Sequence, residues 1–157
     1  MIDCLVNRLG IRAVRRLFPR ASHIPELAQA LRRAFAGPSF WPEQITPKPP
    51  RPQLLFVSPE PVAVLAEIPE GPPAGFTWRR VTRRVVKAEG PERIAPEWWR
   101  GLRVSPPSPG KSRERARPRD YYRIEDEDGH RYWVFREGLY QESEQTMPSW
   151  YLHGVFG

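Results

Sequence analysis

The chain has 157 residues with a hydrophobic fraction of 39%, enough for one modest core, but its 20 prolines lie far above average usage and predict extensive linker. A single cysteine, Cys4, excludes a disulfide framework within the chain and a cysteine-based zinc site, and it favours a reducing compartment. The first ten residues lack the positive start and apolar run of a signal peptide, and no later stretch reaches membrane-spanning length, so we expect a cytoplasmic protein.

The formal net charge of +7 is placed unevenly along the sequence. Residues 76–136 hold 16 Lys/Arg and 9 Asp/Glu, whereas the rest of the chain holds nine of each. A basic segment of this kind suits a polyanion, with nucleic acid as the first choice and an acidic protein surface as the second. The alternative is a solvated basic surface that keeps a small domain soluble.

Residues 1–37 are expected to form a small α+β part. Apolar residues recur at helical spacing over 2–9 and Gly10 follows as a stop, which predicts a short helix. The run AVRRLF at 13–18 is typical of a short strand. Further apolar residues recur at i, i+4 and i+8 over 22–37, which predicts a second helix.

Residues 38–75 are expected to be a proline-rich linker. The stretch PSFWPEQITPKPPRP at 38–52 holds too much proline for a helix or a central strand, and it should run extended, partly as polyproline II. Two strand-like apolar pieces follow, QLLFV and then an alternating run that breaks at Gly71. We expect them to be separate extended pieces that lie on another surface.

Residues 76–157 are expected to form a basic β domain. FTWRR and VTRRVVKAEG are predicted as two strands with a tight turn near Arg79 and Arg80. Residues 104–119 are proline, serine and arginine with almost no apolar side chains, which predicts a disordered insertion. The final WYLHGVFG alternates again, and Gly154 within it allows a bend or a close backbone approach.

The segment RDYYRIEDEDGHRYWVFREGLY at 119–140 has the alternation of a β-hairpin. If Asp128 and Gly129 form a two-residue turn, Ile124 faces Trp133 across the hairpin. The predicted core face then carries Tyr122, Ile124, Trp133 and Phe135. The opposite face carries Tyr121, Arg123, Glu125, Tyr132, Val134 and Arg136. We therefore predict a mainly β fold with a small α+β N-terminal part, whose C-terminal end is a compact antiparallel sheet or a half-open small barrel.

The face that points away from this predicted core combines aromatic rings with guanidinium groups, which is unusual for plain solvent exposure. Tyr121, Tyr132 and Arg123 are predicted to stack on unpaired bases. The residues predicted to meet phosphates are Arg79, Arg80, Arg83, Arg84, Lys87 and Arg136. The alternative is that the tyrosines pack beneath the extended segments that precede the domain.

No set of residues in the sequence assembles into an active site. The acidic run EDEDG at 125–129 is at a hairpin tip, where acids form turns, and the three histidines are far apart in sequence. Cys4 lies in the predicted first helix, where a buried cysteine is commoner than a nucleophile. GKS at 110–112 lacks the earlier glycine of a phosphate-binding loop. We expect a non-enzyme with no metal and no cofactor.

Four blocks of the chain, in the same order, resemble a known family. They are NRLGIRAVRRLFPRASHIPE, EGPERIAPEWWR, RDYYRIEDEDGHRYWVFREGLY and WYLHGVFG. These blocks are similar to the C-terminal region of ImuB-type proteins, the catalytically inactive Y-family DNA polymerase relatives of the bacterial mutagenesis cassette. The resemblance covers almost the whole chain.

The resemblance implies an adaptor of error-prone translesion DNA synthesis in the SOS response, associated with the nucleoid. Such an adaptor bridges the sliding clamp, a RecA-like partner called ImuA and an error-prone DnaE-type polymerase. Residues 1–36 resemble the end of the little-finger DNA-binding domain, so the chain resembles a fragment or the product of a split gene. The competing hypothesis from the residues alone is a β module that binds single-stranded nucleic acid directly.

Two short motifs are candidate partner-binding sites. PQLLF, with Gln53, Leu54, Leu55 and Phe56, resembles the bacterial clamp-binding peptide, although it is one residue shorter than the usual form; the alternative is an ordinary strand. The tandem Trp98 and Trp99 should place one ring inward and one outward. The outward ring is either an interface anchor or a cap on the end of the barrel.

Overall fold

The computed structural model describes residues 2–35, 37, 49–66, 71–97, 99, 117–138 and 148–157. The chain divides into two compact units, Met1–Pro49 and Pro50–Gly157, and each is described by itself. Most of the predicted proline-rich stretch at 38–52, most of the predicted insertion at 104–119, and Trp98 lie outside the described residues. None of the described helices has the length and apolar character needed to span a bilayer.

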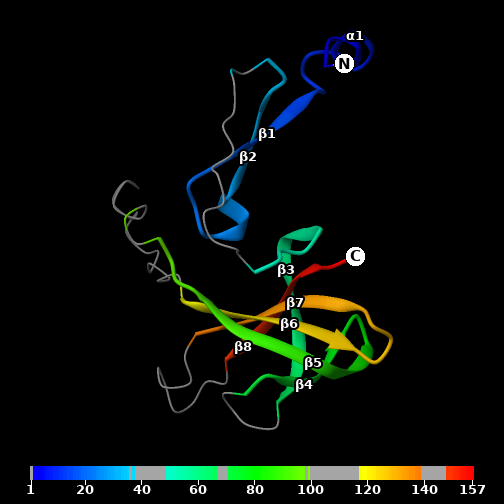
Figure 1. The fold of residues 1–157 in the computed structure, drawn as a ribbon, viewed down its shortest axis with the longest axis vertical. Helices are drawn as coiled ribbons and strands as arrows, with labels where there is room; N and C mark the ends of the chain where they lie inside the picture. Colours follow the sequence, from blue (N-terminus) through cyan, green and yellow to red (C-terminus); the bar gives the residue numbers. More distant parts are fainter. Residues whose placement is uncertain are drawn as a thin grey trace, which may run out of the picture. The chain divides into compact units, whose positions relative to one another are not determined.

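The first unit contains helix α1 (Ile2–Leu9), strand β1 (Arg15–Pro19), a 3-10 turn η1 (Pro25–Leu27) and strand β2 (Gln29–Arg33) (Figure 1). The predicted first helix is confirmed. It ends at Gly10, whose backbone has φ +86° and whose N–H donates to the carbonyl of Val6 at 2.8 Å. Strands β1 and β2 pair antiparallel as a two-stranded ribbon.

The predicted second helix over 22–37 is wrong. The Ser22 hydroxyl accepts a hydrogen bond from the Ile24 N–H at 3.2 Å, and Pro25 begins only a single 3-10 turn. The residues that follow pair with β1, so that Leu31 lies opposite Leu17. Pairing with a neighbouring strand therefore overrides a helical spacing that covered only three apolar positions.

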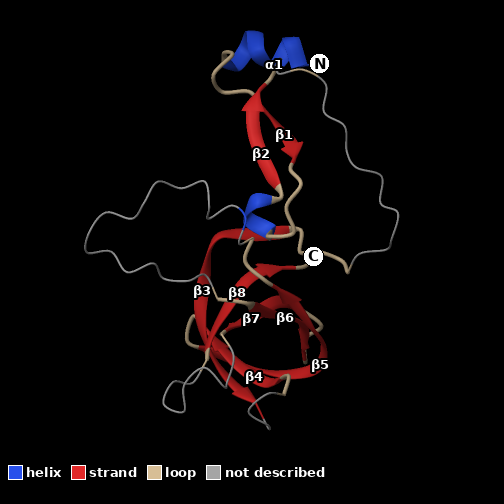
Figure 2. Ribbon diagram, turned by 90° about the vertical axis from the view of Figure 1, so that its left-hand side faces the viewer, coloured by secondary structure: helices blue, strands red, loops and turns tan. Residues whose placement is uncertain are grey.

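The second unit is a closed barrel of six antiparallel strands, each paired with the next in sequence (Figures 1 and 2). The strands are β3 (Leu54–Ala66), β4 (Pro73–Trp78), β5 (Val81–Ile94), β6 (Arg119–Asp126), β7 (Arg131–Glu137) and β8 (Ser149–Val155). Pairing of β8 with β3 closes the ring. The predicted mainly β class is confirmed, and the barrel takes in β3 and the start of β4 from the range that the sequence assigned to the linker.

The interior of the barrel is filled by a cluster of aromatic and branched side chains. Tyr122, Ile124, Val134 and Leu152 are each at most 2% exposed. The full cluster is Val62, Phe76, Tyr122, Ile124, Tyr132, Val134, Trp150 and Leu152. Full burial of each such side chain contributes about 1.5–3 kcal/mol, so this cluster is the main source of the barrel's stability.

The hairpin of β6 and β7 has a register one residue away from the predicted one. Ile124 pairs with Tyr132 rather than with Trp133. The turn is longer than two residues, because the Asp126 N–H donates to the His130 carbonyl at 3.0 Å. Within the turn, Gly129 has φ +80° and its N–H donates to the Asp126 carbonyl. A shift of one residue moves every side chain of one strand to the other face. The predicted sorting of the two faces is therefore wrong for β7.

The outer face of this hairpin is also buried. Trp133 and Phe135, predicted to be inside the barrel, lie on this face with Tyr121 and His153, and all four are at most 2% exposed. Tyr121 stacks on Trp133 with centroids 4.1 Å apart, and its hydroxyl lies 2.8 Å from His153 Nδ1. The guanidinium of Arg51 lies 4.8 Å from the centroid of Trp133. These contacts support the alternative in which Tyr121 packs as part of a core, beside the segment that enters β3.

Gly154 confirms the predicted close backbone approach. A Cβ at this position would lie 2.6 Å from the carbonyl oxygen of Leu54 and 2.7 Å from Cγ of Pro52. Only a residue without a side chain allows β8 and the start of β3 to approach this closely.

We expect Gly154→Ala to lower the free energy of unfolding of the barrel by about 1–3 kcal/mol, because the added methyl group overpacks a rigid backbone contact. Urea unfolding followed by tryptophan fluorescence measures the change. Gly37→Ala is the matched control, since nothing lies within 4 Å of a Cβ there. Equal stability of the two variants would contradict the close-approach explanation.

Candidate interaction surfaces

The predicted tight turn at Arg79 and Arg80 is confirmed, and it joins β4 to β5. Both arginines have positive φ, at 49° and 67°, in a two-residue turn that normally prefers Asn-Gly. Positive φ is costly for a residue with a long side chain, at roughly 1–2 kcal/mol each. The barrel therefore carries two arginines at a position where their backbone is strained.

Arg79 is held by contacts within the barrel. Its guanidinium donates to both carboxylate oxygens of Glu60, at 2.7 and 3.1 Å, and lies 4.6 Å from the centroid of Trp78. Trp78 Nε1 donates to the same carboxylate at 2.6 Å. Hydrogen bonds from Arg79 and then Trp78 hold the pKa of Glu60 below its ordinary value. Arg79 therefore serves the structure of the hairpin.

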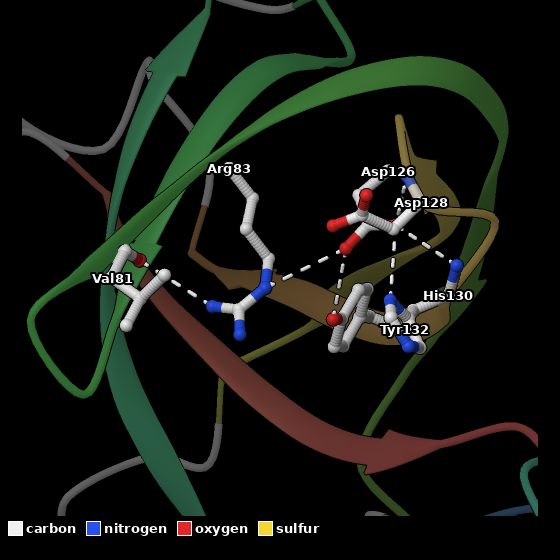
Figure 3. Close-up of polar contacts among 6 residues, drawn as sticks. All are labelled: Val81, Arg83, Asp126, Asp128, His130 and Tyr132. Atoms are coloured by element: carbon white, nitrogen blue, oxygen red, sulfur yellow. Dashed lines mark hydrogen bonds and ion pairs between the residues drawn. The ribbon is translucent and has the colours of Figure 1, made fainter.

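Arg83 faces the acidic turn of the neighbouring hairpin (Figure 3), and Arg84 also lies beside this turn. Arg83 Nε lies 3.5 Å from a carboxylate oxygen of Asp126, and Arg84 Nη1 lies 3.4 Å from Glu127. The acids of EDEDG thus oppose the arginines of the β4–β5 hairpin. Among the described residues, both arginines are therefore matched by acids of the barrel itself.

The carboxylate of Asp126 is nearly shielded from solvent, and both of its oxygens accept hydrogen bonds within the barrel. Oδ1 accepts from the N–H groups of Asp128 and His130 at 3.1 and 2.9 Å, and Oδ2 accepts from the Tyr132 hydroxyl at 3.0 Å (Figure 3). Burial acts to raise the pKa of Asp126, but the His130 N–H and the Tyr132 hydroxyl outweigh it and hold the pKa below its ordinary value. Asp126, Asp128 and His130 lie close enough together to share a cation, yet the turn accounts for their positions.

The remaining residues predicted to bind nucleic acid are paired or buried. Lys87 and Arg123 each lie 2.8 Å from a carboxylate oxygen of Glu89. Tyr121, Tyr132 and Arg136 are at most 5% exposed, so the predicted exposed tyrosine face is wrong. The register shift causes this error for Tyr132, and two-sided burial of β6 causes it for Tyr121. Among the predicted phosphate-binding residues that the structure describes, Arg80 alone is exposed without an ion pair.

Asp120 is a buried carboxylate between two guanidinium groups. Arg93 Nε lies 2.7 Å from Oδ1, and Arg136 Nη2 lies 2.8 Å from Oδ2. The hydrogen bond from Arg93 is the main cause that holds the pKa of Asp120 below its ordinary value, and the bond from Arg136 adds to it against the cost of burial. Arg136 is therefore buried in an ion pair of the barrel and does not face solvent, where a ligand would bind.

The clamp-like motif PQLLF forms the beginning of β3. Leu54 pairs with Val155 and Leu55 with Gly154, while Phe56 stacks on Trp78 with centroids 6.1 Å apart. Gln53 and Leu54 are exposed, and the side chains of Leu55 and Phe56 are half-buried. The geometry favours the ordinary strand, because a peptide bound to a clamp would have to leave β8.

The second motif is only partly described. Trp99 is 47% exposed, as expected for an outward ring, and Trp98 lies outside the described residues.

The ribbon of the first unit carries a basic surface. Counting the charges of all residues outside 76–136 together did not reveal it. Residues 1–49 hold eight Lys/Arg and three Asp/Glu, against 17 and 15 in residues 50–157. Arg15 lies opposite Arg33, and Arg16 lies opposite Arg32. The first unit therefore carries an excess of five positive charges, and the barrel unit an excess of two.

The arginines of the ribbon lie on both of its faces. The guanidinium groups of Arg16 and Arg32 lie 5.7 and 5.1 Å from the centroid of the buried Phe18. Arg15 and Arg33, with Arg12 and Ile11, line a hollow beside the ribbon. None of these arginines forms an ion pair among the described residues. The sequence signal for this surface was the Arg-Arg pair in each strand.

Comparison with known proteins gives one clear similarity. Over its whole length the chain is 47% identical to protein ImuB of Caulobacter vibrioides, in strain NA1000 / CB15N and in strain ATCC 19089 / CIP 103742 / CB 15. The alignment extends over 161 residues, and the chain spans about a third of the length of these curated relatives, 32%. No family model matches the chain, and no solved structure matches it. The predicted resemblance to ImuB-type proteins is confirmed.

We expect Arg80→Gly to raise the free energy of unfolding by about 1 kcal/mol, because glycine adopts the positive φ of the turn at little cost. Chemical unfolding measures the change. Arg79→Gly is the control, since it relieves the same strain but loses the contacts with Glu60 and Trp78. If Arg79→Gly raised the free energy of unfolding as much as Arg80→Gly, the structural role of Arg79 would be contradicted.

We expect Asp120→Asn to lower the free energy of unfolding by about 3 kcal/mol near neutral pH, since it breaks a buried ion pair. Glu127→Gln, at an exposed pair, should cost less than about 1 kcal/mol.

The cost of Asp120→Asn should depend on pH. Because the folded-state pKa of Asp120 is lowered, its stabilisation is fully present above the unfolded value of about 3.9 and is lost as pH falls through the folded value. Urea unfolding at several pH values between neutral and about pH 2 should show the wild type and the variant converging in acid. A difference that stays constant over this range would contradict the assignment.

Proposed function

We propose that this chain is a non-catalytic adaptor module of error-prone translesion DNA synthesis and DNA repair. In this proposal the barrel docks partner proteins, and the basic ribbon of the first unit contacts DNA. The whole-length similarity to protein ImuB supports it. The partners that the family resemblance implies are the sliding clamp, the RecA-like ImuA and a DnaE-type polymerase.

The observation that carries the proposal is the different chemistry of the two units. In the barrel, arginines are matched to carboxylates and most aromatic rings are buried. In the first unit, arginines lie opposite arginines on a two-stranded ribbon. The two kinds of surface suit two kinds of partner.

The barrel fits protein docking better than direct binding of single strands. Single-stranded nucleic acid is bound by aromatic rings that are open to stacking along a positively charged groove. The tyrosines predicted for that role are buried. The barrel instead exposes apolar side chains, and exposed apolar surface is typical of protein interfaces. These exposed residues are Leu54, Val57, Leu65, Val81, Val86 and Trp99.

The ribbon fits a phosphate backbone. Like charges directly opposite one another in adjacent strands destabilise the pair, and a polyanion between them removes that repulsion. Arginine binds phosphate oxygens through two parallel N–H donors, which suits such a site. Phosphate contacts of this kind bind without reading the base sequence.

The proposal assigns no reaction to the chain. The acids of the barrel that are described in detail, Asp120, Asp126 and Glu60, are each occupied by hydrogen bonds from arginine, tyrosine, tryptophan or backbone donors. A general base needs an oxygen that can reach a proton of the substrate. The roles of these three acids are therefore structural.

We expect binding of the chain to single-stranded DNA to weaken with salt, and the slope of log K against log salt to fall in magnitude by about 1.4 when Arg15 and Arg33 are both replaced by alanine. Fluorescence anisotropy with a labelled oligonucleotide at several salt concentrations measures the slope. The double replacement should leave the fold intact, because it removes a repulsion.

The matched control is the double replacement of Arg80 and Arg84 by alanine. It removes the same charge from the exposed tip of the barrel and should leave the slope nearly unchanged. If replacing Arg80 and Arg84 lowered the slope and replacing Arg15 and Arg33 did not, the alternative function would be favoured, a barrel that binds single-stranded nucleic acid directly.

A binding assay tests the adaptor role itself. The purified chain is immobilised and each of the three purified proteins, sliding clamp, RecA-like protein and DnaE-type polymerase, is passed over it in turn. We expect at least one to bind with little dependence on salt. Failure of all three would overturn the adaptor function.

A further inference from the structure

Arg80 occupies the second position of the turn between β4 and β5 without stabilising the barrel. Its backbone has φ +67°, which glycine adopts easily and arginine adopts at a cost. Its side chain is exposed, and within the part of the chain that the structure describes it forms no hydrogen bond, ion pair or ring contact. Arg79 differs, because its guanidinium binds Glu60. A strained residue that the fold does not use is expected where its side chain serves binding.

Apolar side chains lie beside this turn. Val81 is 50% exposed and pairs across the hairpin with Trp78, so the two side chains share one face. Trp78 in turn stacks on Phe56 of β3, with centroids 6.1 Å apart. The next residue, Val57, is fully exposed, because it lies in the irregular part of β3 that does not pair with β8. We call Phe56, Val57, Trp78, Arg80 and Val81 the tip surface.

The composition of the tip surface is that of a protein interface. Arginine and tryptophan are enriched at the centres of such interfaces, and apolar side chains around them exclude water. The guanidinium of Arg80 offers parallel N–H donors that match the two oxygens of a carboxylate. Val57 and Val81 supply exposed apolar surface on either side of it in the sequence and from two different strands.

The charges beside the tip surface favour a protein over a nucleic acid. Glu60 lies next to the turn through its ion pair with Arg79. Glu127 lies close to the same hairpin through its ion pair with Arg84. These two acids repel a backbone that carries a phosphate at every nucleotide. A single carboxylate flanked by apolar side chains instead matches the one guanidinium of Arg80 and the apolar residues beside it.

We infer that the tip surface docks a segment of a partner protein that presents one carboxylate between apolar side chains. The carboxylate accepts two hydrogen bonds from Arg80, and the flanking side chains contact Val57 and Val81. This inference rests on the proposed adaptor function and gives its docking surface a place and a partner chemistry. Binding by the side chain of Arg80 also gives a reason for an arginine where glycine would fold better.

The first test compares the full chain as wild type and as Arg80→Gly. The variant should bind the partner about tenfold more weakly, because it loses the guanidinium. Its thermal unfolding midpoint should rise by about 3–5 °C, because glycine relieves the strained turn. Opposite changes in affinity and stability separate a docking role from a structural one. Arg117→Ala is the control: it removes an exposed arginine near the other end of β5, where β6 begins, and should change affinity by less than about twofold.

The second test replaces an apolar side chain of the tip surface. Val57→Ser should weaken binding by about fivefold, because the fully exposed valine would be covered in the complex. Val86→Ser is the matched control, since Val86 is also an exposed valine, at 58%, but lies outside the tip surface. It should change the affinity by less than about twofold.

The probes are the purified sliding clamp, RecA-like protein and DnaE-type polymerase. Affinity for each is measured by biolayer interferometry with the chain immobilised, and thermal unfolding of every variant checks that the barrel is intact. Binding of the same variants to a labelled single-stranded oligonucleotide is measured by fluorescence anisotropy. We expect Arg80→Gly and Val57→Ser to weaken binding of one protein and to leave binding of the oligonucleotide unchanged.

Three outcomes would overturn the inference. If a protein binds the wild type, Arg80→Gly and Val57→Ser equally, the tip surface is not its docking site while the adaptor function stands. If none of the three proteins binds the wild type, the adaptor function fails and the inference fails with it. If Arg80→Gly weakens binding of the oligonucleotide and of no protein, the tip surface serves nucleic acid.

Discussion

The carboxylate of Asp126 determines which side chains of the barrel face inward. It draws the N–H groups of Asp128 and His130 into the turn, and this makes the turn one residue longer than the Asp-Gly pair alone requires. The longer turn pairs Ile124 with Tyr132, and every later residue of β7 follows from that pairing. A register set by one buried acid thus fixes the barrel core and, on the opposite face, the stack of Tyr121 on Trp133.

Because both faces of this hairpin are buried, charged groups of the barrel gather at its ends and edges. There they meet one another: Arg83 meets Asp126, Arg84 meets Glu127, and two guanidinium groups share Asp120. Such pairs contribute modestly where they are exposed and more where one partner is buried. Their common effect is to leave little unmatched positive charge on the described surface of the barrel.

Local features of the chain were predictable from the sequence, and features that depend on distant pairing were not. The helix at 2–9, the turn at Arg79–Arg80 and the close approach at Gly154 each follow from a few adjacent residues. Strand β3 was hidden because Pro59 and Pro61 are typical of a linker, whereas the structure accommodates them near a register shift between Leu55 and Glu60. Tyr132 was assigned to the outer face because that assignment depended on a single turn, whereas Tyr121 is buried because both faces of β6 are covered.

The division into two units changes what the basic composition means. A net charge counted over the chain points to a polyanion but not to the surface that binds it. Five of the seven excess positive charges belong to the first unit, while Arg83, Arg84, Arg93 and Arg123 of the barrel each lie against one of its own acids. Contacts with phosphate weaken with salt, whereas apolar contact with a protein surface is much less sensitive. In the proposed function, such a chain would hold a partner protein under conditions in which its contact with DNA is exchanged.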